Sequence, residues 1–173
     1  MENKSTFEAS DEKNMILLGF IGFLDPPKES AKESIEKLNK AGIRVIVLTG
    51  DNSEVTRCVC NKVGIKSKNI VLGSEIDKLQ DLAVIRLLKK TNIFAKLSPI
   101  QKARIVRLLK DSGNIVGYMG DGINDSPSLT NSDVGVSVDT AVDIAKESAD
   151  IILLEKDLNV LLDGVTERKK NFW

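Results

Sequence analysis

The segment GYMGDGINDSP, residues 117–127, gathers acidic and carboxamide side chains around two glycines directly after an apolar run. Its two carboxylates, Asp121 and Asp125, repel each other unless a cation lies near them. Mg²⁺ prefers oxygen ligands of this kind and usually keeps several waters. We therefore expect this segment to provide carboxylates for a magnesium ion.

A second polar cluster, Thr49-Gly50-Asp51, ends the apolar run VIVLTGD, and Lys102 lies early in a predicted helix. A threonine hydroxyl and a glycine N–H can hold phosphoryl oxygens, and a lysine can offset their charge. Phosphoryl transfer requires mainly positioning and charge neutralisation. Each part alone has an ordinary structural explanation, as a turn or a solvated lysine. Their joint occurrence in this order indicates phosphoryl chemistry.

The elements that must position these residues alternate between strand-like and helix-like patterns. Strands are predicted at 15–24, 43–48, 69–72, 92–97, 115–119, 134–138 and 150–154. Helices are predicted at 28–42, 53–64, 75–90, 98–113 and 140–148. Such alternation predicts an α/β fold, a parallel sheet with helices on both faces. Ligands bind such sheets beyond the carboxyl ends of the strands, where both polar clusters lie.

Composition excludes several classes of function. The 173 residues carry 25 basic and 25 acidic side chains, and no basic block suggests a nucleic-acid partner. No apolar run reaches the roughly 20 residues that span a bilayer, so we expect a soluble fragment. The chain contains no histidine, which excludes Ser-His-Asp chemistry and histidine-ligated zinc.

Five stretches in order give the chain a family resemblance. They are DPPKES (25–30), VIVLTGD (45–51), FAKLSPIQKARIV (94–106), VGYMGDGINDSPSL (116–129) and DIAKESADIILLEKDL (143–158). Together they resemble the haloacid-dehalogenase-like (HAD-like) superfamily and, more narrowly, the phosphorylation domain of P-type cation-transporting ATPases. GFLDPPKES and ADIILLEKDL look most like the bacterial magnesium-transporting subclass, which makes Mg²⁺ the expected transported ion.

The resemblance implies a role for each residue of the phosphate site. Thr49 and Gly50 would hold the aspartyl phosphate, and Asp51 would help to organise the nucleotide–metal end. Lys102 would contact the transferred phosphate, and Asn124 would form a hydrogen bond in the phosphate region. The implied cofactors of the full pump are Mg²⁺ and ATP.

The resemblance also implies a metal site and a hinge. Asp121 would ligate Mg²⁺ with Asp125 supporting it. Asp25, with Pro26 and Pro27, would form the hinge to the nucleotide-binding domain and contribute to cofactor binding.

The family's domain plan divides the chain into three parts. Residues 1–24 would end the nucleotide-binding domain, 25–157 would form the C-terminal part of the phosphorylation domain, and 158–173 would begin a stalk helix. The partners implied are the rest of the same pump: its nucleotide-binding domain, actuator domain and membrane helices. The parent, meaning the full-length pump to which this chain would belong, would lie in the plasma (inner) membrane. This part of it would lie on the cytoplasmic face.

One element of the family is missing from the sequence. The resemblance implies a covalent phosphate on an Asp-Lys-Thr-Gly-Thr motif that ends the central strand, and the chain has no such motif. We therefore predict a HAD-like Rossmannoid sheet that lacks its central nucleophile strand. The isolated fragment should be inactive toward ATP. Its exposed strand edges should favour a strand-exchanged homodimer.

Two other classes fit the residues less well. A free-standing HAD-family phosphatase would need an Asp-x-Asp nucleophile–acid pair near the N-terminus, and none is present. A receiver-like module that binds Mg²⁺ would also place carboxylates at strand ends. It would need its own phospho-acceptor aspartate and is usually shorter.

Overall fold

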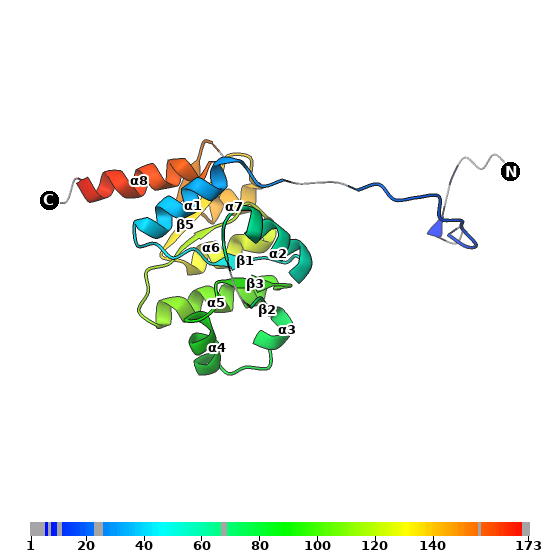
Figure 1. The fold of residues 1–173 in the computed structure, drawn as a ribbon, viewed down its shortest axis with the longest axis horizontal. Helices are drawn as coiled ribbons and strands as arrows, with labels where there is room; N and C mark the ends of the chain where they lie inside the picture. Colours follow the sequence, from blue (N-terminus) through cyan, green and yellow to red (C-terminus); the bar gives the residue numbers. More distant parts are fainter. Residues whose placement is uncertain are drawn as a thin grey trace.

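The computed structural model describes residues 6, 8–9, 12–22, 26–66, 69–155 and 157–170, the last six by their backbone alone. The strands are β1 Val47–Leu48, β2 Val71–Leu72, β3 Ile93–Ala95, β4 Gly117–Met119, β5 Val134–Val138 and β6 Ile151–Leu153. The helices are α1 Ser30–Lys40, α2 Ser53–Lys62, α3 Gly73–Ile76, α4 Asp81–Leu88, α5 Pro99–Asp111, α6 Ser126–Asn131, α7 Asp143–Glu147 and α8 Leu158–Lys170, with a 3₁₀ turn η2 at Ile123–Asp125. Figure 1 shows the helices packed around the strands.

The strands form two parallel three-stranded sheets, with the orders β1-β3-β2 and β4-β5-β6. In the first, Val47 pairs with Ile93 and Val71 with Phe94. In the second, β4 and β6 each pair with the central strand β5, and all three strands run parallel. β1 and β4 are therefore edge strands, and the predicted α/β sheet without its central strand is confirmed as two half-sheets.

Helices cover both faces of the first sheet, as the alternation of β3 shows. Ile93 packs in a cluster with Ile35 of α1 and Cys60 of α2. Its neighbour Phe94 packs in another cluster with residues of α4 and α5, among them Ile105. Successive strand residues point to opposite faces, so both faces are buried under helices.

Helix α5 joins the two sheets into one structure. Its Ile105 and Leu108 belong to the core of the first sheet, whereas Val106 packs with Tyr118 in the core of the second. Leu48 of β1 contacts both clusters. The two half-sheets therefore share an interior around α5 and β1.

Two predicted elements are wrong. The strand expected at 15–24 is absent over residues 15–22, which form neither helix nor strand, and residues 23–24 lie outside the described part. The single helix expected at 75–90 is two helices, because the chain turns between α3 and α4. Arg104 of α5 stabilises that turn by donating to the backbone oxygens of Ile76 and Leu79.

The start of α5 follows from its local sequence. Ser98 caps it by accepting from the N–H of Gln101 at 3.3 Å, and the Gln101 side chain accepts from the Ser98 N–H at 2.8 Å. Pro99 occupies the first helical turn, where its missing donor costs nothing. This capping box fixes where the helix begins, and hence where Lys102 lies. Within the part of the chain that the structure describes, no helix is both long and apolar enough to cross a bilayer.

Candidate active site

The loop after β4 is built around the side chain of Asp125. A Cβ atom placed on Gly120 would lie 2.5 Å from Asp125 Cβ and 2.9 Å from its Oδ2. Only glycine permits the chain to pass this close to the carboxylate. The glycine that follows β4 is therefore required by packing against Asp125.

Three donors hold the Asp125 carboxylate. Lys102 Nζ lies 2.9 Å from Oδ1, and the hydroxyl of Tyr118 donates to the same oxygen at 2.7 Å. The N–H of Gly122 donates to Oδ2 over a longer distance of 3.4 Å. The side chains of the Lys102–Asp125 ion pair are only 12% and 14% exposed. Burial alone would raise the pKa of Asp125, but the bonds from Lys102 and Tyr118 outweigh it and lower this pKa.

Tyr118 is a site residue that the sequence reasoning missed, because it was counted with the apolar end of the strand. It is buried in the core of the second sheet and aims its hydroxyl at Asp125. Burial, followed by the acceptor Asp125, raises the pKa of Tyr118 well above its ordinary value. The available signal was general: a buried tyrosine usually needs a polar partner for its hydroxyl.

The loop after β1 is held differently, mainly through its backbone. The carbonyl oxygens of Thr49 and Asp51 accept from the N–H groups of Leu97 and Lys96, at 3.0 and 2.8 Å. Thr49 Oγ1 donates to Asp51 Oδ2 at 3.0 Å and accepts from the Asp51 N–H at 3.1 Å. Gly50 and Asp51 are exposed. These bonds attach the Thr49–Asp51 loop to the segment that leads directly into α5.

The start of α5 therefore links both predicted clusters. The residues before it bind the loop after β1, and Lys102 in its first turn binds Asp125 in the loop after β4. The geometry brings Lys102 and Asp125 into direct contact and fixes Thr49, Gly50 and Asp51 beside the same helix start. Asn124 lies exposed in the 3₁₀ turn next to Asp125. Asp25 lies outside the described residues.

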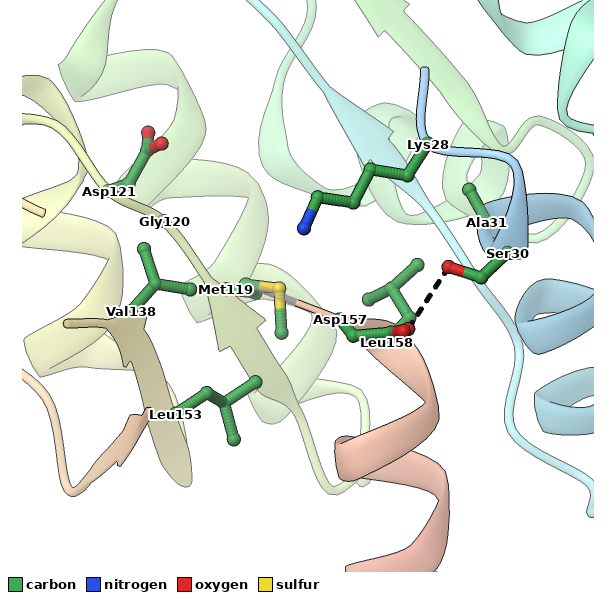
Figure 2. Close-up of a pocket in the computed structure, with 10 residues that line it drawn as sticks. All are labelled: Lys28, Ser30, Ala31, Met119, Gly120, Asp121, Val138, Leu153, Asp157 and Leu158. Atoms are coloured by element: carbon green, nitrogen blue, oxygen red, sulfur yellow. Dashed lines mark hydrogen bonds between the residues drawn. The ribbon is translucent and has the colours of Figure 1, made fainter. Parts of the chain in front are cut away.

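Asp121 lines a cavity of about 340 Å³ between β4 and the helices α1 and α8. Figure 2 shows its carboxylate near one end of this cavity, with the side chain of Lys28 extending into it from the opposite wall. Met119, Val138 and Leu153 provide an apolar floor. The backbone oxygen of Asp121 accepts from the N–H of Val142 at 3.3 Å, which fixes the loop against the turn before α7.

The carboxylates of Asp121 and Asp125 suit a magnesium ion whose remaining ligands come from other groups. Among the residues described, no group of three or more His, Cys, Asp or Glu is placed to hold a metal ion. Asp125 Oδ1 already accepts two strong bonds, whereas Asp121 is exposed at the strand end. Mg²⁺ commonly uses one or two carboxylates with waters and phosphate oxygens. Asp121 is therefore accessible to an ion from solvent, whereas the Asp125 carboxylate is engaged by donors of the protein.

Comparisons with known proteins show which families this chain is similar to. The chain is 50% identical over 166 residues to the "Magnesium-transporting ATPase, P-type 1" of Escherichia coli K12, covering 96% of this chain and 18% of that protein. It is 37% identical over 159 residues to "Calcium-transporting ATPase 1" of Bacillus cereus, covering 90% and 18%. The chain thus spans about a fifth of the length of these relatives and is homologous to that segment of them.

A solved structure of the catalytic domain of the CPx-ATPase CopB-B, studied for its conformational changes upon nucleotide binding, resembles the fold. The TM-score is 0.60 at 31% identity, covering 79% of this chain and 44% of that one. A family model described as "haloacid dehalogenase-like hydrolase" matches residues 3–133. The chain therefore belongs to the haloacid dehalogenase-like hydrolase family.

Proposed function

We propose that this chain forms the C-terminal part of the phosphorylation domain of a magnesium-transporting P-type ATPase. The observation that carries the proposal is the 50% identity to a magnesium-transporting ATPase across nearly the whole chain. The parent would hydrolyse ATP through an aspartyl phosphate and move the ion. This chain would supply residues that bind the phosphate and Mg²⁺, and the nucleophile would come from elsewhere in the parent.

The loop after β1 would bind the phosphoryl group. Thr49 offers a hydroxyl whose present partner is the exposed Asp51, an exchangeable contact. The N–H of Gly50 is a further donor of the kind that holds phosphoryl oxygens. Asp51 would then be free to organise the nucleotide–metal end of the site. A threonine and a glycine at a strand end suit a group whose negative charge is spread over several oxygens.

The start of α5 would supply the positive charge. Lys102 is held by Asp125 close to the loop after β4, so its ammonium group is positioned before any phosphate arrives. A fixed cation stabilises developing charge without reorganisation during the reaction. Asn124, which is exposed on the 3₁₀ turn beside Asp125, would donate a hydrogen bond in the phosphate region.

Asp121 would ligate the magnesium ion, with Asp125 orienting the loop behind it. Bound Mg²⁺ would neutralise charge on the phosphoryl oxygens. The contribution of the chain itself is geometric. Gly120 allows the backbone to pass Asp125, and the bond between the Asp121 oxygen and Val142 fixes the loop that presents the carboxylate.

The remaining parts of the chain would connect this domain to its partners. Residues 1–24 would belong to the nucleotide-binding domain and 25–157 to the phosphorylation domain, with Asp25 in a hinge that also contributes to ATP binding. Residues 158–173 would start the stalk, and α8 is consistent with this as a regular helix. The actuator domain and membrane helices would complete a pump whose phosphorylation domain faces the cytoplasm.

Labelling with radioactive ATP followed by acid precipitation tests the proposal. The full-length parent should give an acid-stable phosphoenzyme, whereas the isolated 173-residue chain should stay unlabelled because it lacks the nucleophile motif. Covalent label on any aspartate of the isolated chain would contradict the proposal, as would a parent that never becomes labelled. Measurement of Mg²⁺ uptake by cells that express the full-length parent would test whether Mg²⁺ is the transported ion.

A further inference from the structure

We infer that Tyr118 is a positioning residue of the phosphate site, whose hydroxyl holds the Asp125 carboxylate so that the Lys102 ammonium keeps one direction. The inference rests on the proposed function, because it concerns the cation that would meet the transferred phosphate. It goes beyond that proposal by assigning a part in the reaction to a residue that would touch neither the phosphate nor the metal ion.

Lys102 depends on Asp125 for its direction. Within the described part of the chain, its ammonium group donates to one acceptor, Oδ1 of Asp125, at 2.9 Å. An ammonium group on a long, flexible stem has no preferred direction of its own. The side chain is only 12% exposed, so water competes little for its donors. The direction of Lys102 therefore follows the direction of the Asp125 carboxylate.

The Asp125 carboxylate is oriented in turn by Tyr118. A carboxylate can rotate about the bond that joins it to Cβ, because that torsion has a broad energy minimum. Two donors besides Lys102 oppose the rotation, one at each oxygen. The Tyr118 hydroxyl donates to Oδ1 at 2.7 Å, whereas the N–H of Gly122 donates to Oδ2 at 3.4 Å. The shorter bond is the stronger one, so Tyr118 supplies most of the restraint.

Tyr118 can impose a direction because its ring is itself fixed. It is the middle residue of β4, pairs with Gly135 of β5 and is only 8% exposed. It packs in the same core cluster as Val106 of α5, one helical turn after Lys102. The tyrosine is thus packed against the helix that presents the lysine, and its hydroxyl meets the carboxylate that binds the lysine.

The surroundings of the phenol favour its bond to Asp125. Burial and Asp125 raise the pKa of Tyr118, and the fully buried Ser128 of α6 opposes them, which places Ser128 close to the phenol. A buried hydroxyl that lost its acceptor would be destabilised by desolvation. A hydrogen bond shielded from water is also electrostatically stronger than one in water. The bond from Tyr118 to Asp125 is therefore a persistent one.

This chain of contacts would affect the rate of phosphoryl transfer. A cation that is positioned in advance stabilises developing charge without reorganisation during the reaction. Loss of the Tyr118 hydroxyl would leave Lys102 and Asp125 paired but would allow the pair several arrangements. Small displacements of a catalytic group lower rates strongly. Binding of ATP should be unaffected, because Tyr118 lies in the core of the second sheet.

NMR relaxation of the Lys102 side chain in the 173-residue chain tests the positioning without the parent. The Cε–Nζ end of Lys102 should be ordered in the wild type and clearly more mobile in Tyr118→Phe, with a lower order parameter. Ser132→Ala is the matched control, since it removes another buried hydroxyl with a 2.7 Å bond, to the Leu129 oxygen, and should leave Lys102 ordered. Unchanged order in Tyr118→Phe, or equal loosening by the control, would overturn the inference.

The rate of phosphoenzyme formation in the full-length parent tests the consequence. Tyr118→Phe should slow single-turnover labelling about tenfold at saturating ATP and leave the ATP concentration for half-maximal rate unchanged. Ser132→Ala should label at the wild-type rate, although it also loses a buried hydrogen bond. In a Lys102→Met background, Tyr118→Phe should slow labelling no further, because it acts through Lys102.

The other outcomes of the kinetic test contradict the inference. A Tyr118→Phe parent with the wild-type rate, or with only an altered ATP requirement, would mean that the hydroxyl does not act on Lys102. A further loss in the Lys102→Met background would mean that it acts by another route. Equal slowing by Ser132→Ala would mean that any lost buried hydrogen bond has this effect. A wild-type parent that is never labelled would overturn the proposed function and this inference with it, whereas the preceding outcomes leave the proposed function intact.

Discussion

The loops after β1 and β4 both end parallel strands, yet they are held in opposite ways. The loop after β4 is anchored through a nearly buried side chain, Asp125, which contacts Lys102 and Tyr118 from other elements. The loop after β1 is anchored by its backbone, and its side chains Thr49 and Asp51 bond to each other at the surface. One carboxylate thus maintains the architecture, whereas the polar groups of the other loop remain available to a ligand.

Among the tests of this difference between the two loops, substitution of Lys102 should have the largest effect on stability. Lys102→Met would leave the nearly buried Asp125 carboxylate without its cation, and we expect a loss of about 2 to 3 kcal/mol of unfolding free energy. Urea unfolding followed by circular dichroism measures it. Lys110→Met, which removes the more exposed ion pair with Asp133, is the control and should cost less than about 1 kcal/mol. Equal losses would contradict the anchoring role of Lys102.

Alanine substitutions at Gly120 and Gly50 compare how tightly the two loops are packed. A methyl group at Gly120 would collide with Asp125, so Gly120→Ala should destabilise the chain by about 1 to 3 kcal/mol. The nearest atom to a methyl group at Gly50 is the oxygen of Leu97 at 3.6 Å, an ordinary contact. Gly50→Ala should therefore change the unfolding free energy by less than about 0.5 kcal/mol. A reversed order in urea titrations would show that the first loop is the more tightly packed.

Removal of one hydroxyl tests the residue that the sequence reasoning missed. Tyr118→Phe deletes a hydrogen bond to a charged acceptor and should cost about 1.5 kcal/mol. It should also raise the pKa of Asp125, since one of the groups that lower it is lost. Urea unfolding of the variant checks the first effect, and NMR titration of the carboxyl carbon checks the second. An unchanged Asp125 pKa would mean that Lys102 alone controls it.

Acid should weaken the anchoring of the loop after β4. The pKa of Asp125 is lowered in the folded state, so its contribution is fully present above the unfolded value near 4 and is lost as pH falls below it. Asp125→Asn should flatten this part of the stability–pH curve. Urea unfolding at a series of pH values measures this curve, and an unchanged curve for Asp125→Asn would contradict this contribution of Asp125.

The smallest effect is expected at the surface of the loop after β1. Thr49→Val removes a hydroxyl whose partners belong to the same exposed loop, and we expect a loss below about 0.5 kcal/mol. The proposed role of Thr49 lies in phosphate binding, so phosphoenzyme formation in the parent should fall far more than stability does. Equal stability losses for Thr49→Val and Lys102→Met would contradict this division.

Much of the fold could be predicted from the sequence because its signals are local. The β-branched run IRVIVL predicts a buried strand, of which Val47–Leu48 forms and is half-buried, and Ser98-Pro99 correctly predicts a helix start. The strand expected at 15–24 had the same apolar signal, but its described part, residues 15–22, pairs with none of the described strands. Strand formation depends on pairing as well as on composition.

The site was predictable at the level of clusters and less so at the level of contacts. The positions of Thr49 and Asp125 after their strands followed from the order of elements. The partnership of Tyr118 with Asp125 did not, because it depends on which face of β4 the tyrosine occupies. Strand register, set by the pairing of Tyr118 with Gly135, decides that face.

Phosphoenzyme formation by variants of the full-length parent tests the central claim most directly, namely that Asp121 and Lys102 serve a magnesium-dependent phosphate site. Asp121→Asn and Lys102→Met should each lower acid-stable labelling by about a hundredfold or more. Asp143→Asn, at a carboxylate 92% exposed on α7, should label like the wild type. Wild-type labelling by the Asp121 variant would contradict the account.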